Sequence, residues 1–213
     1  MTDQPHSPEP APASPLPLFP LGTVLFPGAH LGLKVFEARY LDLIADCLRT
    51  NQPFGVICLR QGADSGPQKS VQLESVGVLA HIDQVDAERP GILRVSCSGG
   101  QRFRLVDKPA QRENGLWVAQ VELMADDPAR QPGAAMMQTV SALAEAIRKL
   151  QDHDKAPFVP PYRLDDAGWV ANRWCELLPV SMSAKQKLME LDDPVIRLSL
   201  VDGFLRDKKV VVG

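Results

Sequence analysis

The sequence predicts an α+β protein in which a β-rich first part is followed by a helical second part. Between residues 91 and 124, apolar residues recur at every second position, as in Leu93, Val95 and Cys97, which is the period of a β-strand. Beyond Asp126 they recur at intervals of three and four, which is the period of an amphipathic helix. The change of period divides the chain into two parts.

Composition indicates a folded protein with no general affinity for polyanions. The chain has 213 residues, of which 45% are hydrophobic, so it can fill a core. Its 23 basic and 26 acidic residues give a net charge of -3, which provides no overall attraction to nucleic acid or anionic lipid. Apolar runs are far shorter than the roughly 20 residues that span a bilayer, and no basic residue precedes Lys34. We therefore expect a cytoplasmic protein with neither a membrane nor a nucleic-acid partner.

Three segments follow from these patterns. Residues 1–15 contain five prolines among small and polar residues, which predicts a disordered tail. Residues 16–126 are predicted to form a β-barrel subdomain, and residues 127–213 a helical bundle subdomain.

The first part begins with short extended pieces. Apolar residues between Leu16 and Phe26 are interrupted by prolines, which cannot donate to a β-ladder. A helix is predicted over residues 37–50, with a buried stripe formed by Tyr40, Leu43, Ile44, Cys47 and Leu48. Strands are expected at residues 55–60, 75–86, 91–98, 101–107 and 115–124, with a turn over residues 98–100. Their close spacing favours an antiparallel, barrel-like sheet.

Helix signals follow in the second part. A core-facing helix contains the series Met136, Val140, Leu143, Ile147 and Leu150. Either Asp165 or Asp166 can cap the next helix, and Ser183 with Gln186 forms a capping-box pattern for another. Asp193 before Pro194 begins the last helix, in which Ile196, Leu200 and Phe204 share an apolar face.

The residues that could carry chemistry have simpler structural explanations. The four cysteines are scattered through apolar segments, which indicates buried thiols and no disulfide. No G-x-S-x-G elbow is present, and the four histidines lie far apart. Ser183 and Lys187 are explained by a helix cap and an exposed lysine. His153, between two aspartates, is typical of a solvated helix end. We therefore expect no catalytic residues, no metal and no cofactor.

The segment from Leu16 to Leu48 carries the motifs of a known family. It combines Leu-Pro-Leu-Phe-Pro-Leu with Phe26-Pro27-Gly28 and with Phe36-Glu37-x-Arg39-Tyr40. This run resembles the opening of the amino-terminal, substrate-binding domain of Lon proteases, especially of freestanding bacterial members. Similar matches occur at residues 75–80, 99–104 and 190–194.

The resemblance implies a PUA-like β pseudobarrel followed by a small helical bundle. A full Lon protease adds an ATPase module and a Ser-Lys protease module, and this chain ends at Gly213 before either begins. No glycine is followed by lysine, so a phosphate-binding loop is not expected. What the resemblance implies is recognition of protein substrates without catalysis.

The leading hypothesis is therefore a non-catalytic module that binds exposed apolar or extended segments of unfolded polypeptides, with a separate protease or chaperone as a further partner. A scaffold role competes with binding at residues 36–40, and both Arg102 and Arg104 are predicted to face solvent. The proposed binding residues are Phe19, Leu21, Leu25, Phe26, Leu31, Leu33, Phe36, Glu37, Arg39, Tyr40 and Arg102.

Two alternatives remain open at this point. A small hydrolase or ligand-processing enzyme would need Glu37, Arg39, Arg102 and Tyr162 to converge in a cleft between barrel and bundle. A PUA-like RNA-binding module would need a basic patch around Arg102, where several acidic residues also occur.

Overall fold

The computed structural model describes residues 14–61, 71–151 and 158–211. These residues form one mixed β-sheet and five α-helices, which confirms the α+β class. Most of the predicted tail, residues 1–13, lies outside the described residues, as does His153. The strands are β1 (Leu16–Leu21), β2 (His30–Val35), β3 (Phe54–Gln61), β4 (Gln72–Arg89), β5 (Ile92–Leu105), β6 (Ala110–Gln111), β7 (Trp117–Ala119) and β8 (Val121–Leu123). The helices are α1 (Ala38–Thr50), α2 (Met137–Gln151), α3 (Ala167–Leu177), α4 (Met182–Glu190) and α5 (Pro194–Asp207), with a 3-10 turn at Ala134–Met136.

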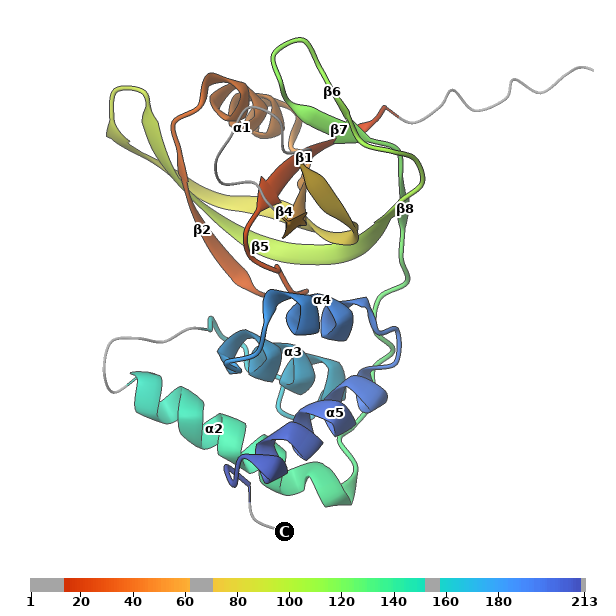
Figure 1. The fold of residues 1–213 in the computed structure, drawn as a ribbon. Helices are drawn as coiled ribbons and strands as arrows, with labels where there is room; N and C mark the ends of the chain where they lie inside the picture. Colours follow the sequence, from red (N-terminus) through yellow and green to blue (C-terminus); the bar gives the residue numbers. More distant parts are fainter. Residues whose placement is uncertain (1–13, 62–70, 152–157, 212–213) are drawn as a thin grey trace, which may run out of the picture.

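The sheet is curved and open. Its strands follow the order β2-β5-β4-β3-β1-β7-β6, and β8 pairs with β5 outside this path. Every pair is antiparallel except β1 with β3. No pairing among the described strands joins β2 to β6, so the ladder does not close. Figure 1 shows α1 against the end of the sheet that lies away from α2–α5.

Strand β5 departs from the prediction, because the expected turn over residues 98–100 is wrong. The strand continues through this point, where its register with β4 shifts between the pairs Ala80–Gly99 and Val78–Arg102. A Cβ atom at Gly100 would lie 2.6 Å from Nε2 of His81 on β4. The glycine here accommodates a bulge and a close neighbour within one long strand.

Helix α1 follows the predicted pattern with one exception. Tyr40, Leu43, Ile44 and Cys47 are buried against the sheet, whereas Leu48 is 54% exposed. The helix ends at Asn51, which has a left-handed conformation with φ of 53°. The four buried residues attach α1 to the sheet and thereby fix the position of the segment before it.

Two of the predicted helix caps are confirmed and one is wrong. Asp166 accepts hydrogen bonds from the first backbone N–H groups of α3, and Asp193 does the same for α5. Helix α4 is capped by Ser181, whose hydroxyl accepts from the N–H of Ala184. Ser183 already lies inside the first turn of α4, so it does not occupy the N-cap position from which a side chain accepts the free N–H groups of that turn.

The predicted apolar face of α5 is only partly buried, because Phe204 packs against the core whereas the other two residues of that face are exposed. Ile196 and Leu200 are 53% and 54% exposed, whereas Leu198 and Val201 are buried. Arg197 shares the buried face, because Asp127 pairs with its guanidinium at 2.5 Å. A charged residue such as Arg197 is ordinarily expected to face solvent. Its burial is possible because its partner, Asp127, comes from a segment distant in sequence.

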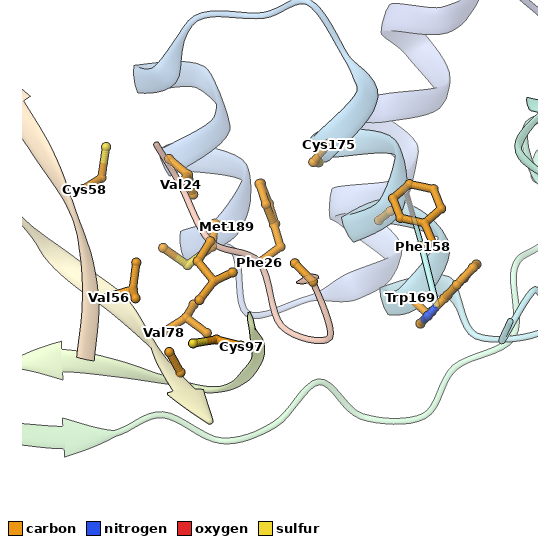
Figure 2. Close-up of a cluster of buried hydrophobic side chains, with 14 of the residues drawn as sticks. Val24, Phe26, Val56, Cys58, Val78, Cys97, Phe158, Trp169, Cys175 and Met189 are labelled. Carbon is orange, nitrogen blue, oxygen red and sulfur yellow. The ribbon is translucent and has the colours of Figure 1, made fainter. Parts of the chain in front are cut away.

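The larger of two hydrophobic clusters runs through the sheet and the helices, and a smaller one, formed by Leu18, Ile57, Leu79, Phe103 and Ala119, lies within the sheet. Figure 2 shows Val56, Val78 and Cys97 of the sheet on one side of Phe26 and Met189, and Cys175 with Trp169 of α3 on the other. All four cysteines are free and buried, as predicted. Burial raises the pKa of Cys97 to about 12, so its thiol stays protonated.

Three buried arginines bridge the sheet and the helices. Arg102 of β5 donates to the carbonyls of Met189 and Leu191 at 3.1 and 2.7 Å. In the opposite direction, Arg173 of α3 donates to the carbonyls of Pro27 and Gly28 between β1 and β2. Arg197 of α5 completes the set through Asp127. These bonds hold the helical part against one end of the sheet, and α1 packs at the other end (Figure 1).

Candidate functional site

A groove of about 420 Å³ is lined by residues of β1 and of the junction between β2 and α1. Strands β3 and β7 complete its walls. Its lining residues are Phe19, Pro20, Leu21, Lys34, Val35, Phe36, Glu37, Arg39, Tyr40, Leu59, Val71 and Trp117. The groove is of the size that accommodates one or two large side chains of a ligand.

The floor of the groove is aromatic. The rings of Phe19 and Tyr40 stack with their centroids 4.0 Å apart, and Phe54 lies 6.0 Å from Phe19. All three side chains are buried and fixed in place, but only Phe19 and Tyr40 line the groove. Burial also raises the pKa of Tyr40, which keeps the phenol neutral at physiological pH.

Phe36 forms an exposed rim above this floor. It lies between β2 and α1 and is 62% exposed, although it is one of the largest apolar residues in the chain. Its position is fixed on both sides, because Val35 is buried at the end of β2 and Tyr40 is buried in the first turn of α1. An aromatic ring held in water at the mouth of a groove is available for contact with another molecule.

Glu37 and Arg39 form the polar edge of the groove. Their side chains make an ion pair of 2.6 Å, and Nη1 of Arg39 donates to the carbonyl of Gly115 at 3.0 Å. The guanidinium also lies 4.8 Å above the centre of the Tyr40 ring. These contacts orient Arg39 along the groove, while Nε of Arg39 is buried without a hydrogen-bond partner among the described residues.

The structure brings six of the predicted binding residues together and separates the other five. Phe19, Leu21, Phe36, Glu37, Arg39 and Tyr40 line the groove. Leu25, Phe26 and Leu33 lie in the core, with exposures of 5%, 0% and 9%. Leu31 is half-buried and packs against the same core.

Arg102 corrects the expectation that it faces solvent. Its side chain is 3% exposed and lies at the sheet–helix junction, where it pairs with Asp127 at 3.0 Å. Its neighbour Arg104 is exposed and Phe103 is buried, as the alternation predicts. Arg102 can be buried because the register of β5 shifts beside it and because the carbonyls of Met189 and Leu191 accept hydrogen bonds from its guanidinium.

The predicted binding residues omit Pro20, Lys34 and Val35, which lie beside predicted ones in the chain, and also Leu59, Val71 and Trp117. The last three reach the groove from β3, from the residue before β4 and from β7, which are distant in sequence from residues 19–40. Alternation within a strand indicates which side chains share a face, but it does not indicate which other strand lies opposite. No local signal in the sequence identifies these three.

The polar groups that a hydrolase would need do not converge. Glu37 and Arg39 lie in the groove, whereas Arg102 lies at the sheet–helix junction, and the hydroxyl of Tyr162 accepts from Gln151 at 2.6 Å. A cleft of about 220 Å³ does exist at the junction, lined by Arg102, Asp126, Asp127, Arg163 and Asp166 among others. Within it Asp166 caps α3 and Asp127 holds two arginines, and its lining includes no histidine, cysteine or serine.

The described part of the chain offers neither a membrane-spanning helix nor a cluster of metal ligands. None of its helices combines the length and the apolar character needed to cross a bilayer. Nor do its histidine, cysteine and carboxylate side chains assemble into a group of three that could bind a metal ion.

Comparison with known proteins gives one consistent family. A sequence model described as the ATP-dependent protease La (LON) substrate-binding domain matches residues 15–207. The chain is 31% identical to Lon protease 2 of Herpetosiphon aurantiacus over 193 residues, which is 87% of this chain and 23% of that protein. It is 26% identical to the Lon protease of Xanthomonas oryzae pv. oryzae, covering 89% of this chain and 22% of that protein. The chain thus spans less than a quarter of these relatives.

Solved structures agree. A Lon N-terminal domain protein from Xanthomonas campestris superposes with a TM-score of 0.72 at 32% identity, covering 90% of this chain and 98% of that one. The N-terminal domain of a Mycobacterium avium complex Lon protease shares the fold, with a TM-score of 0.58 at 18% identity over 91% of this chain and 99% of that one. With the family match over nearly all of the sequence, these likenesses show that the chain belongs to the family of Lon substrate-binding domains.

Proposed function

We propose that this chain is a non-catalytic recognition module that binds exposed apolar or extended segments of unfolded polypeptides in the groove between β1 and the β2–α1 junction. The observation that carries the proposal is the arrangement of aromatic residues there. Phe36 is 62% exposed at the rim, directly beside a stacked pair formed by Phe19 and Tyr40.

The chemistry of the groove suits a polypeptide better than a small polar metabolite. Most of its lining is apolar, and its three charged side chains are already paired, Glu37 with Arg39 and Lys34 with Glu88. Binding energy would therefore come from burial of apolar surface, at about 25 cal/mol per Å². Folded proteins conceal their large apolar residues, so such a groove discriminates in favour of unfolded chains.

The family supports the same assignment, since its description is a substrate-binding domain and the matched relatives are Lon proteases. We extend the proposal to a cytoplasmic protein whose partners include a separate protease or chaperone. Its architecture would be a PUA-like β subdomain over residues 16–126, including α1, and a helical bundle subdomain over residues 127–213.

Binding to a permanently unfolded protein tests the proposal. We expect the chain to bind reduced, carboxymethylated α-lactalbumin, and Phe36→Ser to weaken this binding at least about tenfold, since it removes about 1.5–3 kcal/mol of buried aromatic contact. Its stability should change little, because Phe36 is already exposed.

Val106→Ser is the matched control. Val106 is 67% exposed, but it lies after β5 and does not line the groove. The control should bind the unfolded protein like the parent. No binding by the parent, or an equal loss in both variants, would show that the groove is not the recognition site.

A further inference from the structure

We infer that the polypeptide held in the groove joins the sheet as an additional strand along the free edge of β2. The inference rests on the proposed function and names the binding mode. Strand β2 stands at one end of the sheet and pairs only with β5 among the described strands. An edge strand of this kind presents unpaired N–H and C=O groups that a second chain can bond.

The hydrogen-bond phase of β2 identifies the outward groups. The carbonyl of Ala29 accepts from the N–H of Gly99 at 2.8 Å, and the same register continues without a shift along the β2–β5 pair. Because hydrogen-bonded residues alternate in an antiparallel pair, residues 31, 33 and 35 direct their N–H and C=O groups toward β5. His30, Gly32 and Lys34 therefore direct theirs away from the sheet.

These three residues leave the edge accessible. Each is exposed, and within the described part of the chain no hydrogen bond engages their outward backbone groups. Nζ of Lys34 is held at 2.9 Å by Glu88, which draws this side chain toward the end of β4. No atom lies within 4 Å of the position that a Cβ on Gly32 would occupy.

The edge leads into the groove. Lys34 and Val35 at the end of β2, with Phe36 immediately after them, are part of the groove lining. A segment paired with β2 would thus place apolar side chains over the aromatic floor while its backbone bonds to the edge. The six residues of β2 offer about 20 Å of edge. Among the other free edges in the described structure, β6 and β8 have only two and three residues. The part of β4 beyond Ala80 also pairs with β5 alone, but it contributes no residue to the groove.

This mode predicts which polypeptides bind. Main-chain bonds are the same for every sequence, so affinity would require an extended segment of about six residues, with an apolar side chain at the groove end and no proline opposite His30, Gly32 and Lys34. Tolerance of sequence is the property that a module for unfolded proteins needs. The recognised class is an unfolded chain of β-forming, alternating apolar composition.

Substitution at Gly32 provides the test. Gly32→Pro removes one outward N–H while leaving the β5 ladder intact, since that ladder uses residues 31, 33 and 35. We expect it to weaken the binding of a ten-residue peptide alternating Phe with Ser at least tenfold, as measured by fluorescence anisotropy. Gly32→Ala is the control, because it adds a methyl group in open space and keeps the N–H; its affinity should stay within twofold of the parent.

A second measurement on the unmodified chain guards against misfolding of the proline variant. Peptides carrying one N-methyl group at successive positions should lose affinity at every second position, because alternate N–H groups face β2. A loss that does not alternate would overturn the strand-addition inference.

The outcomes separate this inference from the proposed function. If Gly32→Pro and the N-methylated peptides bind like their parents while Phe36→Ser binds weakly, the groove is the site and strand addition is wrong. If the unmodified chain binds neither the peptide nor carboxymethylated α-lactalbumin, the proposed function itself is wrong.

Discussion

Nη2 of Arg102 on strand β5 donates to Oδ1 of Asp127 over 3.0 Å, and the same carboxylate also holds Arg197 of α5. Asp127 lies between the last strand and the helices, so this one carboxylate joins the two halves of the fold. Because Arg102 and Arg197 are 3% and 1% exposed, neither charge can rely on water if Asp127 is lost.

Arg102→Met should therefore destabilise the protein by roughly 3 kcal/mol, because it leaves the carbonyl of Met189 without the Arg102 donor and removes one of the two guanidinium groups that pair with Asp127. The free energy of unfolding in urea measures this change. Arg104→Met is the control two residues along the same strand; Arg104 is exposed, so its cost should be below about 0.5 kcal/mol. Equal costs would show that the junction does not depend on Arg102.

The free energy of unfolding should depend on pH through the buried carboxyl group of Glu176. Burial raises the pKa of this carboxyl from 4.5 to about 7, despite an ion pair of 2.6 Å with Arg173. Since the folded state then binds more protons than the unfolded state between these two values, the contribution of Glu176 to stability decreases as pH rises from about 4.5 to 7. The penalty is complete above pH 7.

Glu176→Gln should remove this decrease, which urea unfolding at several pH values will detect. Exposed Glu113 provides the control, and Glu113→Gln should keep the pH profile of the parent. A Glu176→Gln profile parallel to that of the parent would contradict the assignment.

Replacement by alanine should change the free energy of unfolding in opposite directions at Gly203 and Gly77. Gly203 lies on the exposed side of α5 with no atom within 4 Å of an added Cβ, so Gly203→Ala should raise the unfolding free energy by about 0.5–1 kcal/mol. At Gly77 on β4 the added Cβ would lie 2.5 Å from the carbonyl oxygen of Val56. Gly77→Ala should therefore lower stability by about 1–3 kcal/mol. Calorimetric unfolding checks both, and changes of the same sign would contradict the expectation.

The orientation of α5 can be tested with two leucines that are two residues apart. Leu198 is fully buried and Leu200 is 54% exposed. We expect Leu198→Ala to cost about 2–5 kcal/mol and Leu200→Ala less than about 1 kcal/mol in urea unfolding. The reverse order would mean that the apolar stripe containing Ile196 and Leu200 faces the core.

Features that depend on neighbours in sequence could be predicted. The four buried residues of α1, the caps Asp166 and Asp193 and the α+β class all follow from spacing and from the residues beside them. The motifs between Leu16 and Tyr40 were sufficient to recognise the family and contained seven of the twelve groove residues that carry the candidate site.

The sequence by itself thus determined the helices, the change from strands to helices and the family, because periodicity and capping are local properties of the chain. Only the tertiary structure decided that Arg102 and Arg197 are buried, that Ile196 and Leu200 are exposed, and that Trp117 lines the same groove as Phe36. The physical reason is that the burial of a charge or the exposure of an apolar side chain depends on partners from distant segments, whose contacts no local pattern records.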